Sequence, residues 1–161
     1  RKNTFLYKVG TYAHSFRFNL YGNGFELDKA EGKDCFNCKG FVRSDDLIAT
    51  VQGDFGLVWD GTSVDGCTGD FGEYLKYNNP HKTSLYIRCG LPVIIWKKAA
   101  LAEFVRINHI GICVASLADL DSVLNTLSTQ EYNEMKENVK KISERLRQGY
   151  YILKALDEVK F

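Results

Sequence analysis

The sequence predicts an α/β domain built on a parallel sheet with helices on both faces. Short apolar segments alternate with amphipathic helical ones, and this alternation is typical of parallel sheets. The chain has 161 residues with 45% hydrophobic content, enough for one compact core. A long helix of mixed charge closes the chain. We therefore expect a single three-layer domain over residues 1–161.

The first part of the chain contains two predicted strands and one helix. Residues 16–21 (FRFNLY) form a strand closed by Gly-Asn-Gly, and residues 36–41 form a second strand. Ser44 is the expected cap of a helix whose first-turn aspartates suit the positive end of its dipole. The opening residues RKNTFLYKVG are typical of a loop entering a helix, whereas a sheet of this type opens with a strand. We therefore expect the opening strand and a preceding domain upstream of residue 1.

The rest of the chain continues the alternation. Residues 55–59 are a short apolar run of the fully buried kind, and the glycine-rich segment 60–79 is long enough to be a functional loop. A helix follows the loop. Ser128 and Glu131 form a capping box for the long helix, in which Gly149 is the expected break. Between these landmarks we expect a strand at 92–96, a helix at 99–107, a strand at 110–114 and a helix at 117–127.

The segment beyond Gly149 has more apolar residues than are needed for the single buried face of an amphipathic helix. Two interpretations are open: the segment packs on its own sheet, or part of it covers a partner domain. The residues concerned are Tyr150, Tyr151, Leu153, Leu156, Val159 and Phe161.

Composition excludes several classes of function. A formal net charge of +1 gives no general attraction to nucleic acid or anionic membranes. The longest apolar runs are far shorter than the roughly 20 residues that span a bilayer. Five cysteines are an odd number for a disulfide framework and indicate a reducing, cytoplasmic setting. Cys35 and Cys38 form a C-x-x-C, but the second pair of a zinc ribbon is missing, so we interpret them as buried free thiols and expect no metal.

Positive charge gathers where two predicted helices begin. Asn79 is the expected N-cap and Pro80 the first helical residue, which places Lys82 in the first turn. A cation there is unfavourable by roughly 0.3–1 kcal/mol unless an anion is bound. Lys97 and Lys98 repeat the pattern before the next helix. Both turns open at the carboxyl edge of the sheet, where open α/β folds bind ligands. The alternative is that these lysines are simply solvated.

The glycine-rich segment fits the same site. Glycines at 66, 69 and 72 allow a close approach of backbone to ligand, although glycines also serve ordinary turns. Glu73 ends the segment near the predicted anion site, and His81 shares the first helical turn with Lys82. No Walker-type G-x-x-x-x-G-K-[ST] motif is present, so the chain is not a P-loop nucleotidase.

These residues resemble a known family. The stretches FGLVWDG, GEYLKYNNPHKTSLYIRCGLPVIIWKKAALAEF and NHIGICVASL are similar to the C-terminal half of bacterial GT-B glycosyltransferases. The resemblance is to the galactofuranosyltransferase-like enzymes of surface-polysaccharide loci and the accessory glucosyltransferases that extend glycans on serine-rich adhesins. It covers residues 2–127, and its most specific element is P-x-K-x3-Y-x3-G-x-P-V-I.

The resemblance implies a Rossmann-like domain that binds a nucleotide-diphosphate sugar, in particular a UDP-sugar. A preceding domain would hold the acceptor, a glycan or glycoprotein. The activity implied is metal-free transfer of a hexose such as galactofuranose or glucose, without a cofactor, and this domain alone would bind donor without turnover. The family leaves peripheral membrane association and homo-oligomer formation of the full-length enzyme open, and it implies no nucleic-acid partner.

The resemblance also implies a set of donor-binding residues. Lys82 would meet the diphosphate, Lys2 would approach it from the other side, and His81 would adjoin them. Tyr21 and Phe41 would flank the base. Where many GT-B enzymes hold the ribose with a glutamate, this chain has Leu85, and Glu73 is the candidate substitute. The sugar and phosphate side would be lined by Lys76, Lys97 and Lys98.

Two other functions remain open on the sequence. A nucleotide-sugar epimerase has a carboxyl half built in a similar way, and it would interconvert a nucleotide sugar without an acceptor. A non-catalytic nucleotide-binding or assembly module would use the tyrosine-rich tail as its contact surface and give no product.

Overall fold

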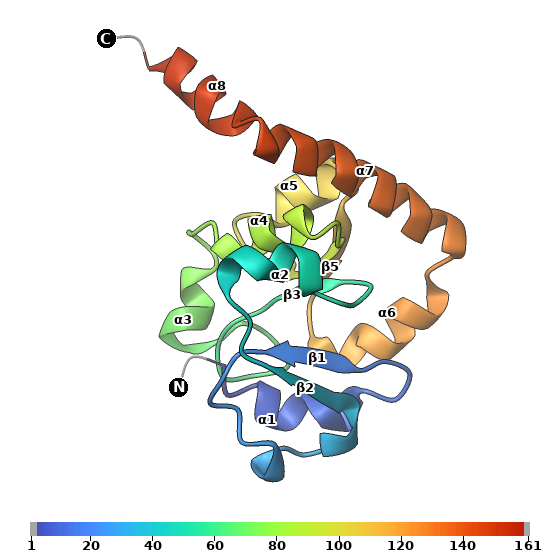
Figure 1. Cartoon of the computed structure of the whole chain (residues 1–161). Coiled ribbons are helices and arrows are strands. Elements are labelled where there is room, and N and C mark those ends of the chain that lie inside the picture. Colours follow the sequence, from blue (N-terminus) through green and yellow to red (C-terminus); the bar gives the residue numbers. More distant parts are fainter. Residues whose placement is uncertain (1–2, 160–161) are drawn as a thin grey trace.

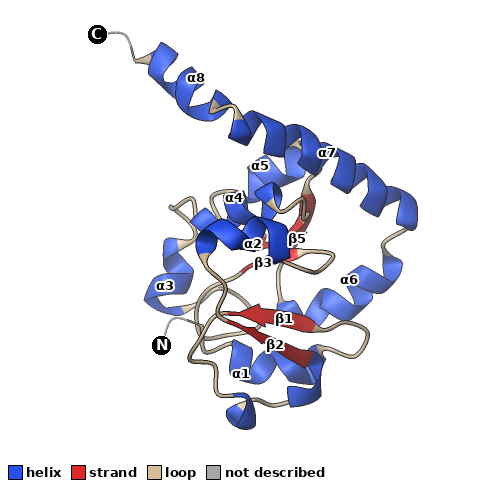
Figure 2. Ribbon diagram, viewed as in Figure 1, coloured by secondary structure: helices blue, strands red, loops and turns tan. Residues whose placement is uncertain are grey.

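The computed structural model describes residues 3–159, with positions 44 and 45 described for their backbone alone. It confirms the α/β class, the parallel strands and the long C-terminal helix (Figures 1 and 2). The strands are β1 (Phe18–Tyr21), β2 (Phe36–Gly40), β3 (Gly56–Val58), β4 (Val93–Trp96) and β5 (Gly111–Val114).

Hydrogen bonding divides these strands into two parallel sheets. One sheet pairs β1 with β2, and the other has the order β3-β4-β5. In the larger sheet Val58 lies opposite Ile95, and Ile95 lies opposite Cys113. The sequence predicts one sheet, but within residues 3–159 no ladder joins β1 to β3. A cavity lies between them, and it is considered below.

The core is centred on the larger sheet. All four residues of β4 are buried, as expected for a central strand covered on both faces. The helices are α1 (Leu6–Val9), α2 (Ser44–Thr50), α3 (Gly69–Tyr74), α4 (His81–Arg88), α5 (Ala102–Ile107), α6 (Leu120–Thr126), α7 (Thr129–Arg147) and α8 (Tyr150–Glu158), with short 3-10 turns at Gly10–Tyr12, Leu27–Lys29, Lys33–Cys35 and Leu117–Asp119.

Helix α4 connects the sheet to the C-terminal part of the chain. It packs against β3 on one side and against α7 on the other, while α5 packs against β4 and β5. In the view of Figure 1, α4, α5 and α7 lie together above the larger sheet, and α1 lies below β1 and β2. Helix α4 is therefore held between the larger sheet and the C-terminal helix.

Several helix boundaries differ from the sequence prediction. Helix α2 begins at Ser44 with Arg43 as its N-cap residue, so Ser44 is not the cap. Helix α4 begins at His81 with Pro80 in the N-cap position, one residue later than predicted, and no side chain caps it. The predicted loop 60–79 contains α3. Helix α5 starts at Ala102 rather than near 99, because Ala99 and its neighbours form a turn after β4.

The C-terminal helix follows the prediction closely. Ser128 and Glu131 make the capping box, and Gly149, in a left-handed conformation with φ 69°, separates α7 from α8. Val139 and Ile142 of α7 are buried. Helix α8 instead projects from the body (Figure 1), and Tyr150, Ile152, Leu153, Leu156 and Val159 are exposed. Packing on the domain's own core therefore accounts for α7, while the apolar side chains of α8 remain largely uncovered.

Candidate functional site

The centre of the candidate site is an ion pair between α4 and the end of β3. The Lys82 ammonium donates to the Asp60 carboxylate at 2.7 Å and to the Trp59 carbonyl at 3.0 Å. The Asp60 side chain is only 4% exposed, whereas that of Lys82 is 25% exposed. Because Trp59 and Asp60 directly follow β3, the ammonium lies at the carboxyl end of that strand, where the sequence analysis predicts it.

The first turn of α4 adds further positive character at this place. It contains no acidic residue, and its earliest recorded backbone bond is from Thr83 N–H to the Pro80 carbonyl. Within the described residues, no acceptor is recorded for the backbone N–H groups of His81 and Lys82. Free N–H groups at a helix start carry partial positive charge and attract anions.

Two buried polar atoms beside this turn lack partners. The Thr83 hydroxyl and the Asn78 side-chain oxygen are both buried, and neither has a hydrogen-bond partner in the described part of the chain. Thr83 as a whole is 2% exposed. Buried polar groups normally have a hydrogen-bond partner. The start of α4 therefore has two polar atoms available for a further hydrogen bond.

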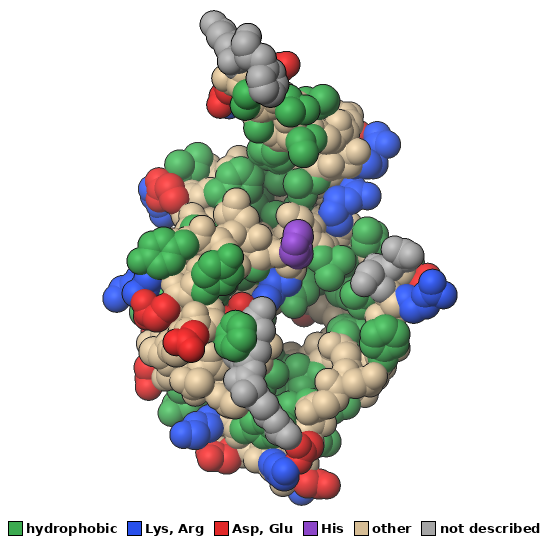
Figure 3. Space-filling model, turned by 90° about the vertical axis from the view of Figure 1, so that its left-hand side faces the viewer, with side chains coloured by type: hydrophobic (Ala, Val, Ile, Leu, Met, Phe, Trp, Pro, Cys, Tyr) green, Lys and Arg blue, Asp and Glu red, His purple; other side chains and the backbone are tan. Residues whose placement is uncertain are grey.

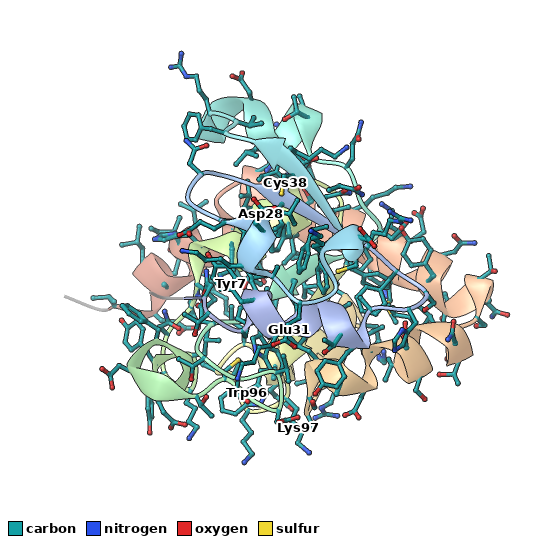
Figure 4. All side chains as sticks on the ribbon, turned by 90° about the horizontal axis from the view of Figure 1, so that it is seen from below. Tyr7, Asp28, Glu31, Cys38, Trp96 and Lys97 are labelled. Atoms are coloured by element: carbon teal, nitrogen blue, oxygen red, sulfur yellow. The ribbon has the colours of Figure 1, made fainter. Side chains whose placement is uncertain are left out.

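Lys97 and Lys98 lie at the same edge of the sheet. They directly follow β4, the neighbour of β3, and Lys97 N–H donates to the Val114 carbonyl at 2.8 Å. Both side chains are exposed. They lie in a turn before the helix, as predicted, although α5 begins only at Ala102, three residues later than expected. Figure 4 shows Lys97 beside Trp96 at the periphery of the molecule.

Lys76 and Glu73 form a second ion pair near the end of α3. The hydrogen bond from Lys76 to Glu73 raises the pKa of the Lys76 ammonium. The ammonium also lies 5.7 Å from the centre of the Trp96 ring, a cation–π distance. A backbone bond of 2.8 Å from Ala100 to Leu75 ties α3 to the turn that contains Lys97. Lys76, Lys97 and Lys98 therefore belong to one region.

The remaining predicted residues are dispersed. The Tyr21 hydroxyl, at the end of β1, accepts from Gln52 N–H at 2.9 Å and lines the cavity together with Lys82. His81 is exposed at the start of α4. Phe41 follows β2, the strand farther from the larger sheet (Figure 1), is 68% exposed and does not line this cavity. Lys2 lies outside the described residues.

Other residues of the P-x-K-x3-Y-x3-G-x-P-V-I stretch hold the fold. A Cβ on Gly56 would lie 2.1 Å from Cγ of Tyr86, so the strand accepts only glycine beneath this ring. Burial raises the pKa of the Tyr86 hydroxyl. Gly90, with φ 74°, ends α4, and the Pro92 carbonyl accepts from Gly56 N–H at 2.8 Å. The sequence analysis did not predict Asp60 as a site residue. Its position directly after the buried run 55–59, at the end of a strand, is the feature that could have indicated it.

Neither a metal cluster nor a membrane helix is found among residues 3–159. No group of three or more His, Cys, Asp or Glu side chains there is arranged to hold a metal ion. No helix there has the length and apolar character needed to cross a bilayer. All five cysteines are free thiols. Cys35 is buried, as predicted, but the prediction of a buried thiol is wrong for Cys38, which is exposed because only the beginning of β2 is covered.

Parallel strands with helices packed against them, and the start of α4 at their carboxyl edge, define a Rossmann-like α/β domain. The chain belongs to the family described as Glucosyltransferase 3-like, C-terminal domain, which it matches over residues 1–159. This confirms the family resemblance predicted from the sequence.

Named relatives agree with this assignment. The chain is 41% identical over 159 residues to the beta-1,6-galactofuranosyltransferase WbbI of Escherichia coli K12, covering 98% of this chain and 46% of the relative. It is 34% identical over 119 residues to Glucosyltransferase 3 of Streptococcus gordonii, covering 74% of this chain and 35% of the relative. The chain therefore spans half or less of the length of these relatives, both of which are named as glycosyltransferases.

Proposed function

We propose that this domain binds the diphosphate of a nucleotide sugar, in particular a UDP-sugar, as the donor half of a hexosyltransferase. The observation that carries the proposal is the Lys82 ammonium at the carboxyl end of β3, beside the free N–H groups of α4. Relatives named as galactofuranosyl- and glucosyltransferases support a hexose such as galactofuranose or glucose as the group transferred. The acceptor would be a glycan or glycoprotein.

The chemistry proposed is electrostatic. When the bond between sugar and diphosphate breaks, negative charge grows on the leaving nucleoside diphosphate. A fixed ammonium and helix N–H groups stabilise that charge without reorganising at the moment of reaction. Asp60 holds the ammonium in place before the donor arrives. When the donor binds, Lys82 donates some of its hydrogen bonds to phosphate oxygens instead. In this proposal no metal or other cofactor takes part.

Lys97, Lys98 and Lys76 form the outer part of the proposed site. Their shared position at the carboxyl edge of β4 suits contacts to the sugar and the distal phosphate, and Glu73 orients Lys76 through their ion pair. The free thiols favour a cytoplasmic location for the protein.

Calorimetric titration of the protein with uridine diphosphate tests the proposal. We expect binding to the wild type, and at least about tenfold weaker binding to the Lys82→Met variant, because a hydrogen bond to a charged group is lost. Lys141→Met is the matched control: Lys141 is an exposed lysine on α7 whose recorded bond is to Asn138, and its replacement should leave affinity unchanged. Equal affinity in the Lys82 and Lys141 variants, or no heat from the wild type, contradicts the proposal.

A product assay separates the enzymatic function from its alternatives. With a UDP-hexose and a glycan acceptor, the full-length chain should give a glycosylated product. Conversion of the nucleotide sugar without acceptor would identify an epimerase. Binding of uridine diphosphate with no product in either assay would indicate a non-catalytic module.

A further inference from the structure

Helix α3 and the turn after it present a column of exposed aromatic rings beside the proposed donor site. We propose that this aromatic column, formed by Phe71, Tyr74 and Tyr77, binds the sugar rings of the acceptor glycan by stacking. The inference deepens the proposed function and rests on it, because it identifies the bound glycan with the acceptor. The family resemblance assigns the acceptor to the preceding domain, so the aromatic column gives the donor domain a share in acceptor recognition.

The sequence of this segment repeats every three residues. Residues 70–78 read Asp-Phe-Gly, Glu-Tyr-Leu and Lys-Tyr-Asn, so a charged residue, an aromatic residue and a third residue recur in that order. Tyr77 N–H donates to the Tyr74 carbonyl at 3.0 Å, an i to i+3 bond, and the two residues before Tyr77 bond in the same way. Such turns have about three residues per turn, so side chains three positions apart lie above one another. Residues of each kind therefore share one side of the segment.

The third residue of each repeat faces the interior. Leu75 is 1% exposed, and the side-chain oxygen of Asn78 is buried. Gly72 is buried too, and a Cβ there would lie 2.4 Å from the Cys67 backbone. Because this side of the segment is closely packed, the aromatic side is held toward solvent.

The aromatic column is large enough to be a binding surface. Exposed fractions are 54% for Phe71, 59% for Tyr74 and 80% for Tyr77. An aromatic side chain buries about 150–250 Å² when it is fully covered, so these three could bury roughly 300–500 Å². A stable protein interface needs about 800 Å² from each partner. The column therefore suits a short chain of rings better than a folded protein.

The charged residues beside the rings favour an uncharged ligand. Asp70, Glu73 and Lys76 form the adjoining side, on which Glu73 and Lys76 are paired with each other. Figure 3 views the molecule from the side where α3 lies in Figure 1, and it shows acidic side chains next to large hydrophobic ones. Two carboxylates against one ammonium give no attraction to an anionic membrane or to nucleic acid.

An oligosaccharide fits both sides of the segment. The C–H groups on the face of a sugar ring are attracted to the negative face of an aromatic ring, and this contact covers apolar surface. Carboxylates accept hydrogen bonds from hydroxyl groups, and an ammonium donates to them. The aromatic column and the charged residues beside it can therefore bind the ring faces and the hydroxyl groups of the same ligand.

The aromatic column leads to the proposed donor site. Three residues separate Tyr77 from His81, the first residue of α4, and Ala100 N–H donates to the Leu75 carbonyl at 2.8 Å. Three residues advance by about 4.5 Å in an α-helix and by about 6 Å in a 3-10 helix. This spacing is close to the length of one sugar unit, so successive rings can stack on successive units. A glycan bound in this way has one end near the start of α4, where its terminal hydroxyl can meet the donor sugar.

Titration of the full-length chain with a β-linked glucose tetrasaccharide, without nucleotide, tests the inference. Calorimetry and saturation-transfer NMR measure the affinity. We expect the wild type to bind, Tyr77→Ala to bind at least about threefold more weakly, and the double variant Tyr74→Ala/Tyr77→Ala about tenfold more weakly, because stacking contacts are lost. Tyr77→Phe keeps the ring and should bind like the wild type. Tyr12→Ala is the matched control, since Tyr12 is an exposed tyrosine on another element, and it should leave affinity unchanged.

Two results overturn the inference. One is the absence of a response from the wild type, or equal affinity of the wild type and the double variant for the tetrasaccharide. The other is obtained with vesicles of phosphatidylserine and phosphatidylcholine. If the double variant loses affinity for these vesicles and the tetrasaccharide gives no response, the aromatic column binds a membrane surface and not a glycan.

Two further measurements separate this inference from the proposed function. Uridine diphosphate should bind the double variant as it binds the wild type, and the tetrasaccharide should bind Lys82→Met as it binds the wild type. Failure of the proposed function therefore appears in the uridine diphosphate titration, and failure of the inference in the tetrasaccharide titration. In the transfer assay, the double variant should have a KM for the acceptor about tenfold higher and an unchanged KM for the donor. A change confined to the KM for the donor contradicts the assignment to the acceptor.

Discussion

The Lys82 ammonium lies 2.7 Å from a carboxylate of Asp60 that is 4% exposed. A charge buried to this extent needs a partner, so the ion pair has a role in the fold as well as in the site. Lys82 is the more exposed member and can share its donors with a ligand, whereas Asp60 remains in the interior. Under the proposed function, this asymmetry suits a lysine that is held in position before the diphosphate binds.

A double-mutant cycle on Lys82 and Asp60 separates the role of the ion pair in stability from its role in binding. Lys82→Met removes the ammonium partner of a buried carboxylate and should lower the free energy of unfolding by about 1–3 kcal/mol, less than for a fully buried pair because Lys82 is partly exposed. The double variant Lys82→Met/Asp60→Asn no longer buries an unpaired carboxylate, so it should recover most of the lost stability. It should not recover the binding of uridine diphosphate. Urea denaturation measures the first effect and calorimetry the second. A Lys82→Met variant as stable as the wild type shows that the pair does not support the fold.

The sequence predicts the position of Lys82 well but not its partner. Pro80 and the apolar runs 55–59 and 92–96 are local signals, and together they place the start of α4 at the carboxyl edge of the sheet. The bond from Lys82 to Asp60 spans 22 residues, and no periodic pattern encodes such a contact. The pairing therefore emerges only from the packing of α4 on β3.

The glycine-rich segment 60–79 is a second case in which a local sequence pattern does not predict a long-range contact. Its composition predicts a loop in which glycines admit a ligand, but Gly72 lies inside α3, where a Cβ would come within 2.4 Å of the Cys67 backbone. Close packing of α3 on the preceding turn is what requires this glycine. The division into two sheets could not be predicted either, because the pairing of strands far apart in the sequence is set by topology and not by a local pattern.

Gly56→Ala should destabilise the protein by about 1–3 kcal/mol, as overpacking of a core does. The added Cβ would lie 2.1 Å from Cγ and 2.5 Å from Cβ of Tyr86, atoms close to the backbone of α4 that cannot swing aside. Gly66→Ala is the matched control, since its Cβ would have its nearest contact at 3.6 Å, on Trp96. Thermal and urea unfolding compare the two. Similar losses in both variants would show that the Tyr86 contact is not the cause.

Asp121 should make stability depend on pH in the acid range. Its carboxylate accepts from the Ser15 hydroxyl at 2.6 Å and from the Ser15 and His14 N–H groups at 2.9 Å, which ties α6 to the loop before β1. The Ser15 hydroxyl bond first, and then the backbone donors, lower the pKa of Asp121 below its ordinary value of 3.8.

A lowered pKa in the folded state gives stability that is fully present above the unfolded pKa and is lost as pH falls through the folded pKa. The wild type should therefore be more stable than Asp121→Asn near neutral pH, and the difference should close as the pH falls below 3.8. Exposed Asp119, which has no such recorded bonds, provides the control variant Asp119→Asn. Urea midpoints measured across the acid range give the answer, and a constant difference between wild type and Asp121→Asn contradicts the assignment.

Thiol labelling should distinguish Cys67 from Cys38. Cys67 is fully buried, and burial raises the pKa of its thiol to about 12, so near pH 8 it is both inaccessible and protonated. The thiolate is the reactive form, and access to the reagent is also needed. In the native protein, iodoacetamide should therefore label exposed Cys38 readily and Cys67 only after unfolding by urea, as followed by mass spectrometry of the peptides. Labelling of native Cys67 at the rate of Cys38 would mean that the turn between β3 and α3, which positions Asp60, opens far more often than its packing indicates.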